Sequence, residues 1–253
     1  MTATLTVSVV LPARNEAVAI TALLADISAA MAGVLHEIIV VDDGSTDDLV
    51  QVVLAAMRRN PDLRLLRHDR SCGQSAALRT GILAARGRLI ATLDADGQNP
   101  PADLPRLLAP LLDPGAGNLG LVQGQRRKRQ DRWTRRAGSR IANGIRGALL
   151  RDGVRDSGCG LKAFPRAVYL SLPYFDHIHR FMPAMVLREG HQVMVVEVDH
   201  AERNGGRSNY SNLQRALVGM VDLLGAAWLI RRRKLPVVQE TRPGQEIGQD
   251  RLS

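Results

Sequence analysis

The stretch "LTVSVVLPARNEAVAITALLADISAAMAGVLHEIIVVDD" (Leu5–Asp43) decides the fold. It begins with an apolar, β-branched run over Leu5–Leu11 and continues with a helical repeat of apolar residues over Ala17–Met31. A second apolar run, His36–Asp43, ends it. Nearly continuous apolar strands separated by a helix are typical of a parallel sheet covered on both faces. The stretch therefore predicts an α/β fold.

The same alternation continues along the chain. We expect helices over residues 47–60 and 74–87 and strands over residues 63–67 and 88–94. Together these elements predict a doubly wound, mostly parallel sheet flanked by helices. Further on we expect strands over residues 119–125 and 191–200 and helices near residues 133–150 and over 180–190. A loop over 156–164 should lead into another strand, and a glycine-rich loop should cover 201–210.

Composition narrows the class of protein. The chain has 253 residues and is 45% hydrophobic, enough for one large core or for one domain with an appendage. Its two cysteines, Cys72 and Cys159, have neither a disulfide framework nor a metal-binding spacing, which indicates free thiols in a reducing compartment. No basic segment precedes the first apolar run, so we expect no signal peptide. Only 3% of the residues are aromatic, which argues against a single-stranded nucleic acid as partner.

The charge of the chain is positive and uneven. A net charge of +9 predicts an anionic partner. Much of it lies in "RRKRQDRWTRRAGSR" (Arg126–Arg140) and in "RRRK" (Arg231–Lys234). Charge runs are usually solvated, but this density and nearly pure sign favour a patch that binds phosphate or faces a membrane.

Polar clusters follow three of the expected strands. They are "PARNE" (12–16), "DDGSTDD" (42–48) and "DADGQNPP" (94–101). In doubly wound sheets, ligands bind at the carboxyl ends of the strands, where these clusters would meet. Helix caps and turns account for single Asp, Asn and Gly-Ser residues, but not for consecutive acids at two strand ends. The clusters therefore predict a ligand site at this edge.

The third cluster has the chemistry of a metal site. If the chain is extended here, the side chains of Asp94, Asp96 and Gln98 point the same way. Carboxylate and amide oxygens suit Mg²⁺ or Mn²⁺, and such an ion commonly joins protein carboxylates to substrate phosphates. With the arginine-rich segment, this pattern predicts a diphosphate substrate.

The last apolar segment, Leu213–Ile230, is short for a membrane span and carries Arg215 and Asp222. These two charges share one helical face and leave a wide apolar remainder. We expect an amphipathic helix at a membrane interface, ahead of a helix packed on its own domain or on a second copy, and a spanning helix last. The remainder, residues 236–253, reads as a disordered tail.

Six motifs occur in the order seen in inverting family 2 glycosyltransferases. They are "VVLPARNE", "VVDDGSTDD", "GQSAALRTG", "LDADGQNPP", "DSGCGLKAF" and "RNGGRSNY". The sequence most resembles the polyprenyl-phosphate sugar synthases, the dolichol-phosphate mannosyltransferase-like group, over roughly Val7 to Tyr210. This resemblance implies a GT-A catalytic domain over residues 1–210, followed by the amphipathic helix with its basic end over 211–235.

The resemblance also implies an activity and a site. The donor would be a nucleotide-diphosphate sugar, the cofactor Mg²⁺ or Mn²⁺, and the acceptor a polyprenyl phosphate. The residues implied to bind the nucleotide are Pro12, Arg14, Glu16, Asp42, Asp43, Gly73 and Asp94, and those implied to bind the metal are Asp94, Asp96 and Gln98. The residues implied to bind phosphate or the acceptor are Arg126, Arg135, Ser139, Arg203 and Ser208. The residues implied to take part in catalysis are Asp96, Asp156 and Arg126. The group often has lysine where this chain has Asn209.

The acceptor sets the expected mechanism. The second pKa of a phosphate monoester is about 6, so the acceptor is already a nucleophile at neutral pH. The enzyme then mainly positions the reactants and stabilises the leaving nucleotide diphosphate. Asp156 would act as a base or hold a sugar hydroxyl, unless it only forms a turn. We expect His68, His177, His179 and His191 to be structural, because their spacing is not that of ligands.

Three other interpretations stay open. A family 2 enzyme acting on a saccharide or lipid hydroxyl would need a firm catalytic base. A nucleotidyltransferase would normally carry a glycine-rich loop after its first strand, and "LPARNEA" is not one. A non-enzymatic protein that binds anionic lipid or nucleotide would lose affinity for phosphate through its strand-end acids unless a metal intervened.

The expected location is the cytoplasmic face of a membrane, with the protein bound peripherally through its basic segments. The apolar C-terminal helix is also suited to a contact between two copies of the chain. The expected donor is a sugar linked to UDP or to GDP.

Overall fold

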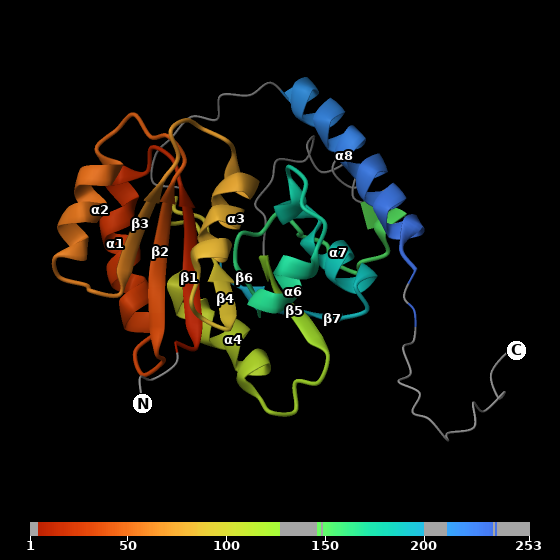
Figure 1. The fold of residues 1–253 in the computed structure, drawn as a ribbon, viewed down its shortest axis with the longest axis horizontal. Helices are drawn as coiled ribbons and strands as arrows, with labels where there is room; N and C mark the ends of the chain where they lie inside the picture. The colour runs from red at the N-terminus through yellow and green to blue at the C-terminus, as the bar shows by residue number, and fades with distance from the viewer. Residues whose placement is uncertain (1–4, 127–145, 148, 200–211, 235, 237–253) are drawn as a thin grey trace, which may run out of the picture.

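The computed structural model describes residues 5–126, 146–147, 149–199, 212–234 and 236. Its centre is a seven-stranded sheet in the order β3-β2-β1-β4-β6-β5-β7 (Figure 1). The strands are β1 (Val7–Ala13), β2 (His36–Asp42), β3 (Leu63–Arg67), β4 (Leu89–Thr92), β5 (Leu119–Arg126), β6 (Lys162–Pro165) and β7 (Gln192–Val198).

The sheet is mostly parallel, as the strand–helix alternation predicts. Strand β1 pairs in parallel with both β2 and β4, and β2 pairs in parallel with β3. The short strand β6 lies antiparallel between β4 and β5, and β7 is parallel to β5. Because β1, β2 and β4 run in one direction, their carboxyl ends lie at the same edge of the sheet.

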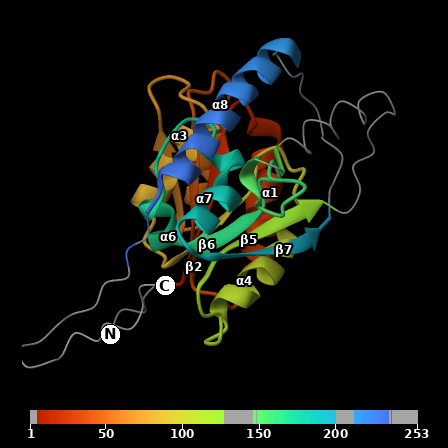
Figure 2. The ribbon, with the colours of Figure 1, turned by 90° about the vertical axis from the view of Figure 1, so that its right-hand side faces the viewer.

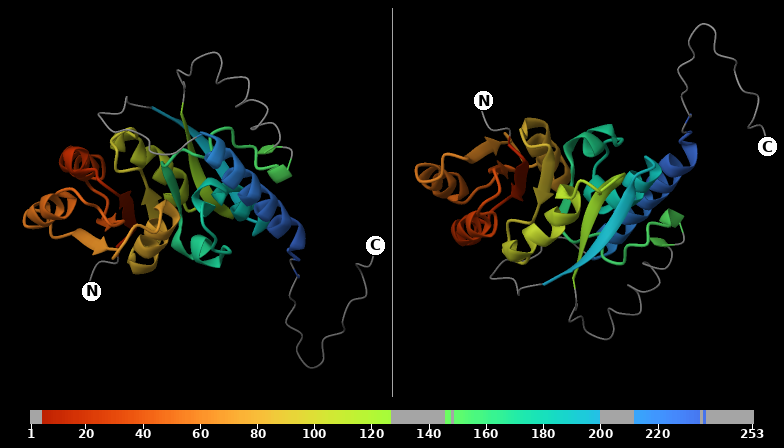
Figure 3. Two further views of the ribbon diagram at one scale, coloured as in Figure 1. Left: turned by 90° about the horizontal axis from the view of Figure 1, so that it is seen from above. Right: turned by 90° about the horizontal axis from the view of Figure 1, so that it is seen from below.

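Helices cover both faces of the sheet (Figures 2 and 3). On one face α1 (Ala17–Ala30), α2 (Leu49–Met57) and α4 (Leu104–Leu112) pack in one core cluster with residues such as Val9. On the other face α3 (Gln74–Ala84), α6 (Arg166–Ser171), α7 (Met182–Arg188) and α8 (Asn212–Arg232) pack in a second cluster with residues such as Val10. Adjacent strand residues face opposite sides, so apolar runs fill both cores.

Some boundaries and elements differ from the sequence-based expectation. Strand β4 ends at Thr92 rather than at Asp94, because the chain turns through residues 95–96 immediately afterwards. Helix α4, whose start is marked by Pro105, and the short helix α6 were not predicted from the sequence. The expected helix near residues 133–150 and the loop over 201–210 lie largely or wholly outside the described residues, as does nearly all of the 236–253 tail.

Helix α8 lies diagonally against α7 at the side of the molecule (Figure 2). Ala226 and Ala227 are buried there, and Leu223, Leu229 and Ile230 pack against the second core cluster. The helix therefore has one face on the domain, the arrangement we ranked second. Among the described residues, no helix is long and apolar enough to cross a membrane.

Candidate nucleotide-sugar site

A polar cavity of about 640 Å³ lies at the edge where β1, β2 and β4 end. It combines acids with the cations Arg14 and Arg180. Seven residues expected to bind nucleotide or metal line it: Pro12, Arg14, Glu16, Asp43, Gly73, Asp94 and Asp96. The structure therefore brings together residues from three separate strand ends.

The loops after β1 and β2 are bonded to one another. The carboxylate of Asp47 accepts hydrogen bonds from the backbone N–H of Ala17 at 3.0 Å and of Leu49 at 3.2 Å, so it caps the first turn of α1 from a different loop. Asn15, whose φ is +57°, accepts a bond from the backbone N–H of Thr46 at 2.8 Å. Some polar residues of "DDGSTDD" therefore hold together the two loops that form part of the cavity wall.

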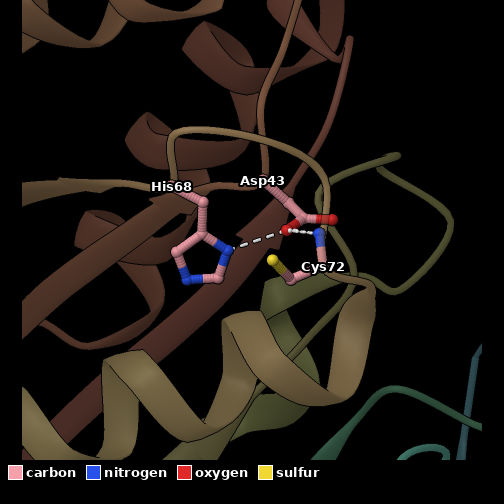
Figure 4. Close-up of side chains that lie close together, drawn as sticks. All are labelled: Asp43, His68 and Cys72. Atoms are coloured by element: carbon pink, nitrogen blue, oxygen red, sulfur yellow. Dashed lines mark hydrogen bonds and ion pairs between the residues drawn. The ribbon is translucent and has the colours of Figure 1, made fainter.

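Asp43 organises the loop that enters α3 (Figure 4). Its Oδ1 accepts bonds from the His68 ring Nδ1 and the backbone N–H of Cys72, both at 2.8 Å. Its Oδ2 accepts bonds from Ser71 Oγ and the backbone N–H of Gly73, both at 2.9 Å. Burial alone would raise the pKa of Asp43, but these hydrogen bonds outweigh it and hold the pKa below its ordinary value.

Ligand atoms of Asp43, His68 and Cys72 lie within 4.8 Å of one another, a grouping of metal-ligand types (Figure 4). The second ring nitrogen of His68 contacts Thr80 Oγ1 at 2.9 Å. With both oxygens of Asp43 already accepting two bonds each, the trio fits a hydrogen-bonded hub that shapes the cavity. His68 is structural in this sense, as expected.

Asp42 lies behind the cavity wall. It is fully buried and does not line the cavity. Its oxygens accept bonds from the backbone N–H of Ser45 at 2.8 Å and from Arg67 Nε at 3.2 Å. Its contribution to the described site is to hold the β2–α2 loop, and direct nucleotide binding by Asp42 stays a prediction.

Asp94 and Asp96 form the acidic end of the cavity. Gln74 Nε2 donates to Asp94 Oδ1 at 2.7 Å, and Asn99 Nδ2 lies 3.4 Å from Oδ2. Burial and the neighbouring charge of Asp96 raise the pKa of Asp94, and the cations Lys162 and Arg126 oppose that rise without cancelling it. Two carboxylates close enough to repel one another are an environment that favours a bound cation.

The chain around Gln98 is not extended, which corrects the premise on which we placed that ligand. A turn occupies residues 95–96, and Gly97 has a φ of +73°. The backbone N–H of Gln98 donates to Asp96 Oδ1 at 3.1 Å, and the residue does not line the cavity. Gln74, from α3, contacts Asp94 instead. A role of Gln98 as a metal ligand stays a prediction.

Asp96 also borders a second, largely apolar groove of about 730 Å³ between α1 and residues 100–102. That groove is larger, but among the residues that the structure describes, Asp26 and Asp96 are the only charged ones that line it. The polar cavity is therefore the one whose chemistry suits a nucleotide diphosphate.

The loop "DSGCGLK" packs against Asp94. Lys162 is buried, and its Nζ donates to the backbone carbonyls of Ser157, at 3.2 Å, and of Cys159. Burial lowers the pKa of Lys162, while the thiol of Cys159 and the carboxylates of Asp94 and Asp156 oppose the fall. The lysine of this motif was not among the residues expected in the site, yet its charge acts on Asp94 and lowers the pKa of that carboxylate.

Arg126 and Asp156 form a two-pronged ion pair. Arg126 Nε donates to Asp156 Oδ2 at 2.6 Å, and Nη2 donates to Oδ1 at 2.8 Å. The hydrogen bond that Arg126 donates to Asp156 is the main cause that raises the pKa of Arg126. A carboxylate held by a guanidinium in this way is a poor proton acceptor. The geometry therefore gives Asp156 the role of orienting Arg126, and base catalysis by Asp156 stays a prediction.

Replacing Arg126 with lysine tests this pairing. Lysine keeps the charge but cannot make the two parallel bonds to Asp156, so the cation would be misplaced. We expect kcat/KM for sugar transfer to fall by about 10²-fold. Arg155→Lys, a change of the same kind on the exposed neighbouring residue, is the control. Equal activity of the two variants would show that the ion pair has no part in the reaction.

Two histidines that we expected to be structural line the cavity. His179 is buried, its Nδ1 lies 2.7 Å from Ser75 Oγ, and burial together with Lys162 lowers its pKa to about 3. It therefore stays neutral at physiological pH. His177 lines the cavity beside Asp176. No local spacing marks these residues, because a turn far along the chain brings them to the strand ends. His191 contacts Asn118 away from the site, as expected.

Four expected phosphate-binding residues, Arg135, Ser139, Arg203 and Ser208, lie outside the described residues. Their roles remain predictions. Arg126 is the last residue of β5, and the structure does not describe residues 127–145, which include Arg135 and Ser139.

Comparisons with known proteins agree with this arrangement. The chain is 34% identical over 250 residues to a dodecaprenyl-phosphate galacturonate synthase of Rhizobium johnstonii, covering 96% of this chain and 71% of that protein. It is 35% identical over 222 residues to an undecaprenyl-phosphate 4-deoxy-4-formamido-L-arabinose transferase of Edwardsiella ictaluri, covering 86% of this chain and 66% of that protein. The chain thus spans about two thirds of the length of these relatives.

Solved structures share the fold. A glucosyl-3-phosphoglycerate synthase of Mycobacterium tuberculosis, crystallised with Mn²⁺, UDP and phosphoglyceric acid, is 23% identical with a TM-score of 0.67, over 89% of this chain and 78% of that one. A mannosyl-3-phosphoglycerate synthase of Rubrobacter xylanophilus is 20% identical with a TM-score of 0.71, over 96% and 79% of the two chains. The model of the family "Glycosyl transferase family 2" matches residues 8–172. The chain therefore belongs to glycosyl transferase family 2 and is a glycosyltransferase with the GT-A fold.

Proposed function

We propose that the protein transfers a sugar from a nucleotide-diphosphate sugar to a polyprenyl phosphate, with inversion at the sugar and with the help of a divalent metal. The observation that carries the proposal is the pair Asp94 and Asp96 in the wall of the polar cavity. The charges of Lys162 and Arg126 lie close enough to Asp94 to lower its pKa against the effect of burial. The names of the relatives support the class of acceptor. The solved structures, with their bound UDP, support the class of donor.

The acidic pair suits a divalent ion. Asp94 and Asp96 are hard oxygen ligands. The pKa of Asp94 is raised by burial and by the charge of Asp96, and Lys162 and Arg126 offset this only in part. Asp94 and Asp96 would hold Mg²⁺ or Mn²⁺, which when bound neutralises charge on the diphosphate of the donor. The Mn²⁺ and Mg²⁺ complexes of the structural neighbours support this choice without deciding between the metals.

The rest of the cavity suits the donor. The wall formed by Pro12, Asp43 and Gly73 would take the nucleoside, and Arg14 and Arg180 would offset phosphate charge. The neutral His179 presents a ring edge that can bond a sugar hydroxyl without adding charge. UDP and GDP remain equal alternatives.

A phosphate acceptor explains why the site needs no strong base. The acceptor is already ionised at neutral pH, and its oxygen attacks the sugar carbon while the bond to the nucleotide diphosphate breaks. Arg126, oriented by Asp156, would place the acceptor phosphate and offset its charge. An acceptor hydroxyl would instead require a free carboxylate, and the described pairing of Asp156 does not favour one.

The outer face of α8 suits an anionic membrane surface. Met220, Val221, Leu224 and Trp228 are between 58% and 70% exposed and lie together on this face. The exposed cations Arg231 and Arg232 follow at its end, and the guanidinium of Arg232 lies 5.7 Å from the Trp228 ring centroid. An apolar stripe bounded by basic residues is typical of interfacial helices. We infer peripheral binding at the cytoplasmic face of a membrane, where the lipid acceptor would be met.

A donor screen tests the proposal. Purified protein is incubated with radiolabelled UDP- and GDP-sugars, polyprenyl phosphate and Mn²⁺ or Mg²⁺, and radioactivity in the organic phase is counted. We expect transfer from one donor that needs the metal and falls by about 10³-fold in Asp96→Ala. Asp62→Asn, which removes a carboxylate at the start of β3 on the opposite edge of the sheet, should keep full activity.

Two outcomes would contradict the proposal. Transfer only to a soluble phosphorylated acceptor or a saccharide, with nothing in the lipid phase, would replace the acceptor. Full lipid-phase transfer in the presence of a chelator would remove the metal from the mechanism.

A further inference from the structure

Asp222 is a carboxylate in the middle of the otherwise apolar part of α8 that the structure describes. Its side chain is 21% exposed and faces the domain, not the apolar outer stripe. The partner is His177, whose Nδ1 lies 2.8 Å from Asp222 Oδ2. The contact has the distance of an ion pair but not the alignment of a hydrogen bond. The carboxylate of Asp222, which is unfavourable in a membrane-spanning helix, thus contacts His177 in the cavity wall.

His177 occupies an unusual backbone conformation. Its φ is +61° and its ψ is 9°, in the left-handed region that residues other than glycine rarely adopt. Such conformations persist only where surrounding contacts hold them, and they gather at functional sites. The residues beside it, Asp176, His179 and Arg180, also line the polar cavity. The shape of one cavity wall therefore depends on what holds His177.

The rest of α8 is fixed to α7 beyond Asp222. Arg188 Nε donates to the backbone carbonyl of Leu229 at 2.9 Å, and Arg233 Nη1 donates to that of Arg188 at 2.7 Å. Ala226, one turn after Asp222, is buried in the second core cluster. The helix is therefore a rigid element whose inner face touches the cavity wall and whose outer face carries the apolar stripe.

We propose that Asp222 is a positioning residue that couples the lipid-facing helix α8 to the donor cavity through His177. When the outer face of α8 rests on lipid, the helix is held in the position seen here, and Asp222 keeps the 176–180 turn in the shape that accepts the nucleotide. Lipid contact and nucleotide binding then strengthen one another, and the coupling is reciprocal. The inference rests on the proposed nucleotide donor and membrane surface, but it adds a dependence between them.

The test measures the dissociation constants of UDP and of GDP, each with Mn²⁺, by calorimetry with and without vesicles of phosphatidylethanolamine and phosphatidylglycerol. We expect vesicles to tighten binding of the preferred nucleotide by about fivefold or more in the wild type. In Asp222→Asn and in His177→Gln the shift should fall below about twofold, and the double variant should lose no more than either one. Asp62→Asn, with the same change of charge far from α8, should keep the wild-type shift.

The controls separate this inference from the proposed function. Flotation of Asp222→Asn with the vesicles should match the wild type, because the outer stripe is unchanged, and circular dichroism checks that the variant is folded. Vesicle binding together with an equal nucleotide shift in wild type and Asp222→Asn, or no shift in either, would overturn the coupling alone. Failure of the wild type to bind vesicles or either nucleotide would overturn the proposed function as well.

Discussion

Gly160→Ala is expected to reduce sugar transfer by about 10³-fold while leaving the fold intact. A Cβ at Gly160 would lie 2.4 Å from Asp94 Oδ2 and 2.6 Å from Oδ1, closer than non-bonded atoms approach. Gly160 does not have a positive φ, so alanine suits its backbone, and the clash falls on the carboxylate of Asp94. Displacing that carboxylate would remove one of the two oxygen ligands proposed for the metal.

Gly158→Ala is the matched control, two residues away in the same loop. A Cβ there would meet only Asp156 Oδ1, at 3.9 Å, which is an ordinary contact. Metal-dependent transfer and the thermal midpoint would be measured for both variants. Similar activity of the two would mean that the position of Asp94 against this loop does not matter for the reaction. A large fall in the midpoint of Gly160→Ala would indicate damage to the fold instead.

Asp94→Asn is expected to abolish transfer and at the same time to stabilise the metal-free protein. The loss of transfer follows from the loss of the charged ligand. The gain in stability follows because burial and the charge of Asp96 raise the pKa of Asp94, so its ionised form costs free energy in the folded state. Asparagine has the same shape and can still accept the bond from Gln74. In a domain of this size, a gain of about 1 kcal/mol corresponds to roughly 2–4 °C in the thermal midpoint.

The difference in stability between Asp94→Asn and the wild type is expected to depend on pH. Above the raised pKa, Asp94 is charged in both the folded and the unfolded state, and the difference in stability between variant and wild type is largest. As the pH falls toward the ordinary carboxyl value of about 3.9, the folded protein takes up the proton first and the difference disappears. Mn²⁺ should raise the midpoint of the wild type and leave that of Asp94→Asn unchanged. A lower midpoint for the variant at neutral pH would contradict the argument.

Glu37→Gln is expected to have the opposite effect on stability at neutral pH. Burial alone would raise the pKa of Glu37, but hydrogen bonds from Ser8, Arg64 and the backbone of Arg86 outweigh it and lower the pKa. Its ionised form therefore stabilises the fold at neutral pH, and that contribution is lost as the pH falls through the lowered pKa. Glutamine at this position should lower the thermal midpoint at neutral pH. Neutralising the two buried acids would then change the thermal midpoint in opposite directions. Hydrogen bonds within the protein outweigh the burial of Glu37, whereas the groups around Asp94 do not offset its burial.

The sequence by itself determined the local elements and the site's position along the chain. Apolar runs such as Val7–Leu11 and the helical repeat after Ala17 correctly predicted the parallel half of the sheet. The acids at residues 43, 94 and 96 correctly indicated a cavity at the strand ends. Periodicity and strand-end polarity are properties of neighbouring residues, so a sequence displays them directly. A strand was expected after the loop over residues 156–164, but the four-residue strand β6 begins inside that range, at Lys162, and its antiparallel place in the sheet was not predicted.

Only the tertiary structure decided which polar groups meet. It placed Gly160 against Asp94 and brought the charge of Lys162 near that carboxylate. It also made Asp43 a hydrogen-bonded hub for the loop after β3 and paired Arg126 with Asp156. It also brought His177 to the cavity and Asp222 to His177. These partners lie about 30 to 70 residues apart in the chain. Their contacts depend on how helices pack on the two faces of the sheet and on where β6 inserts. No local pattern records that, because packing is decided by the whole core at once.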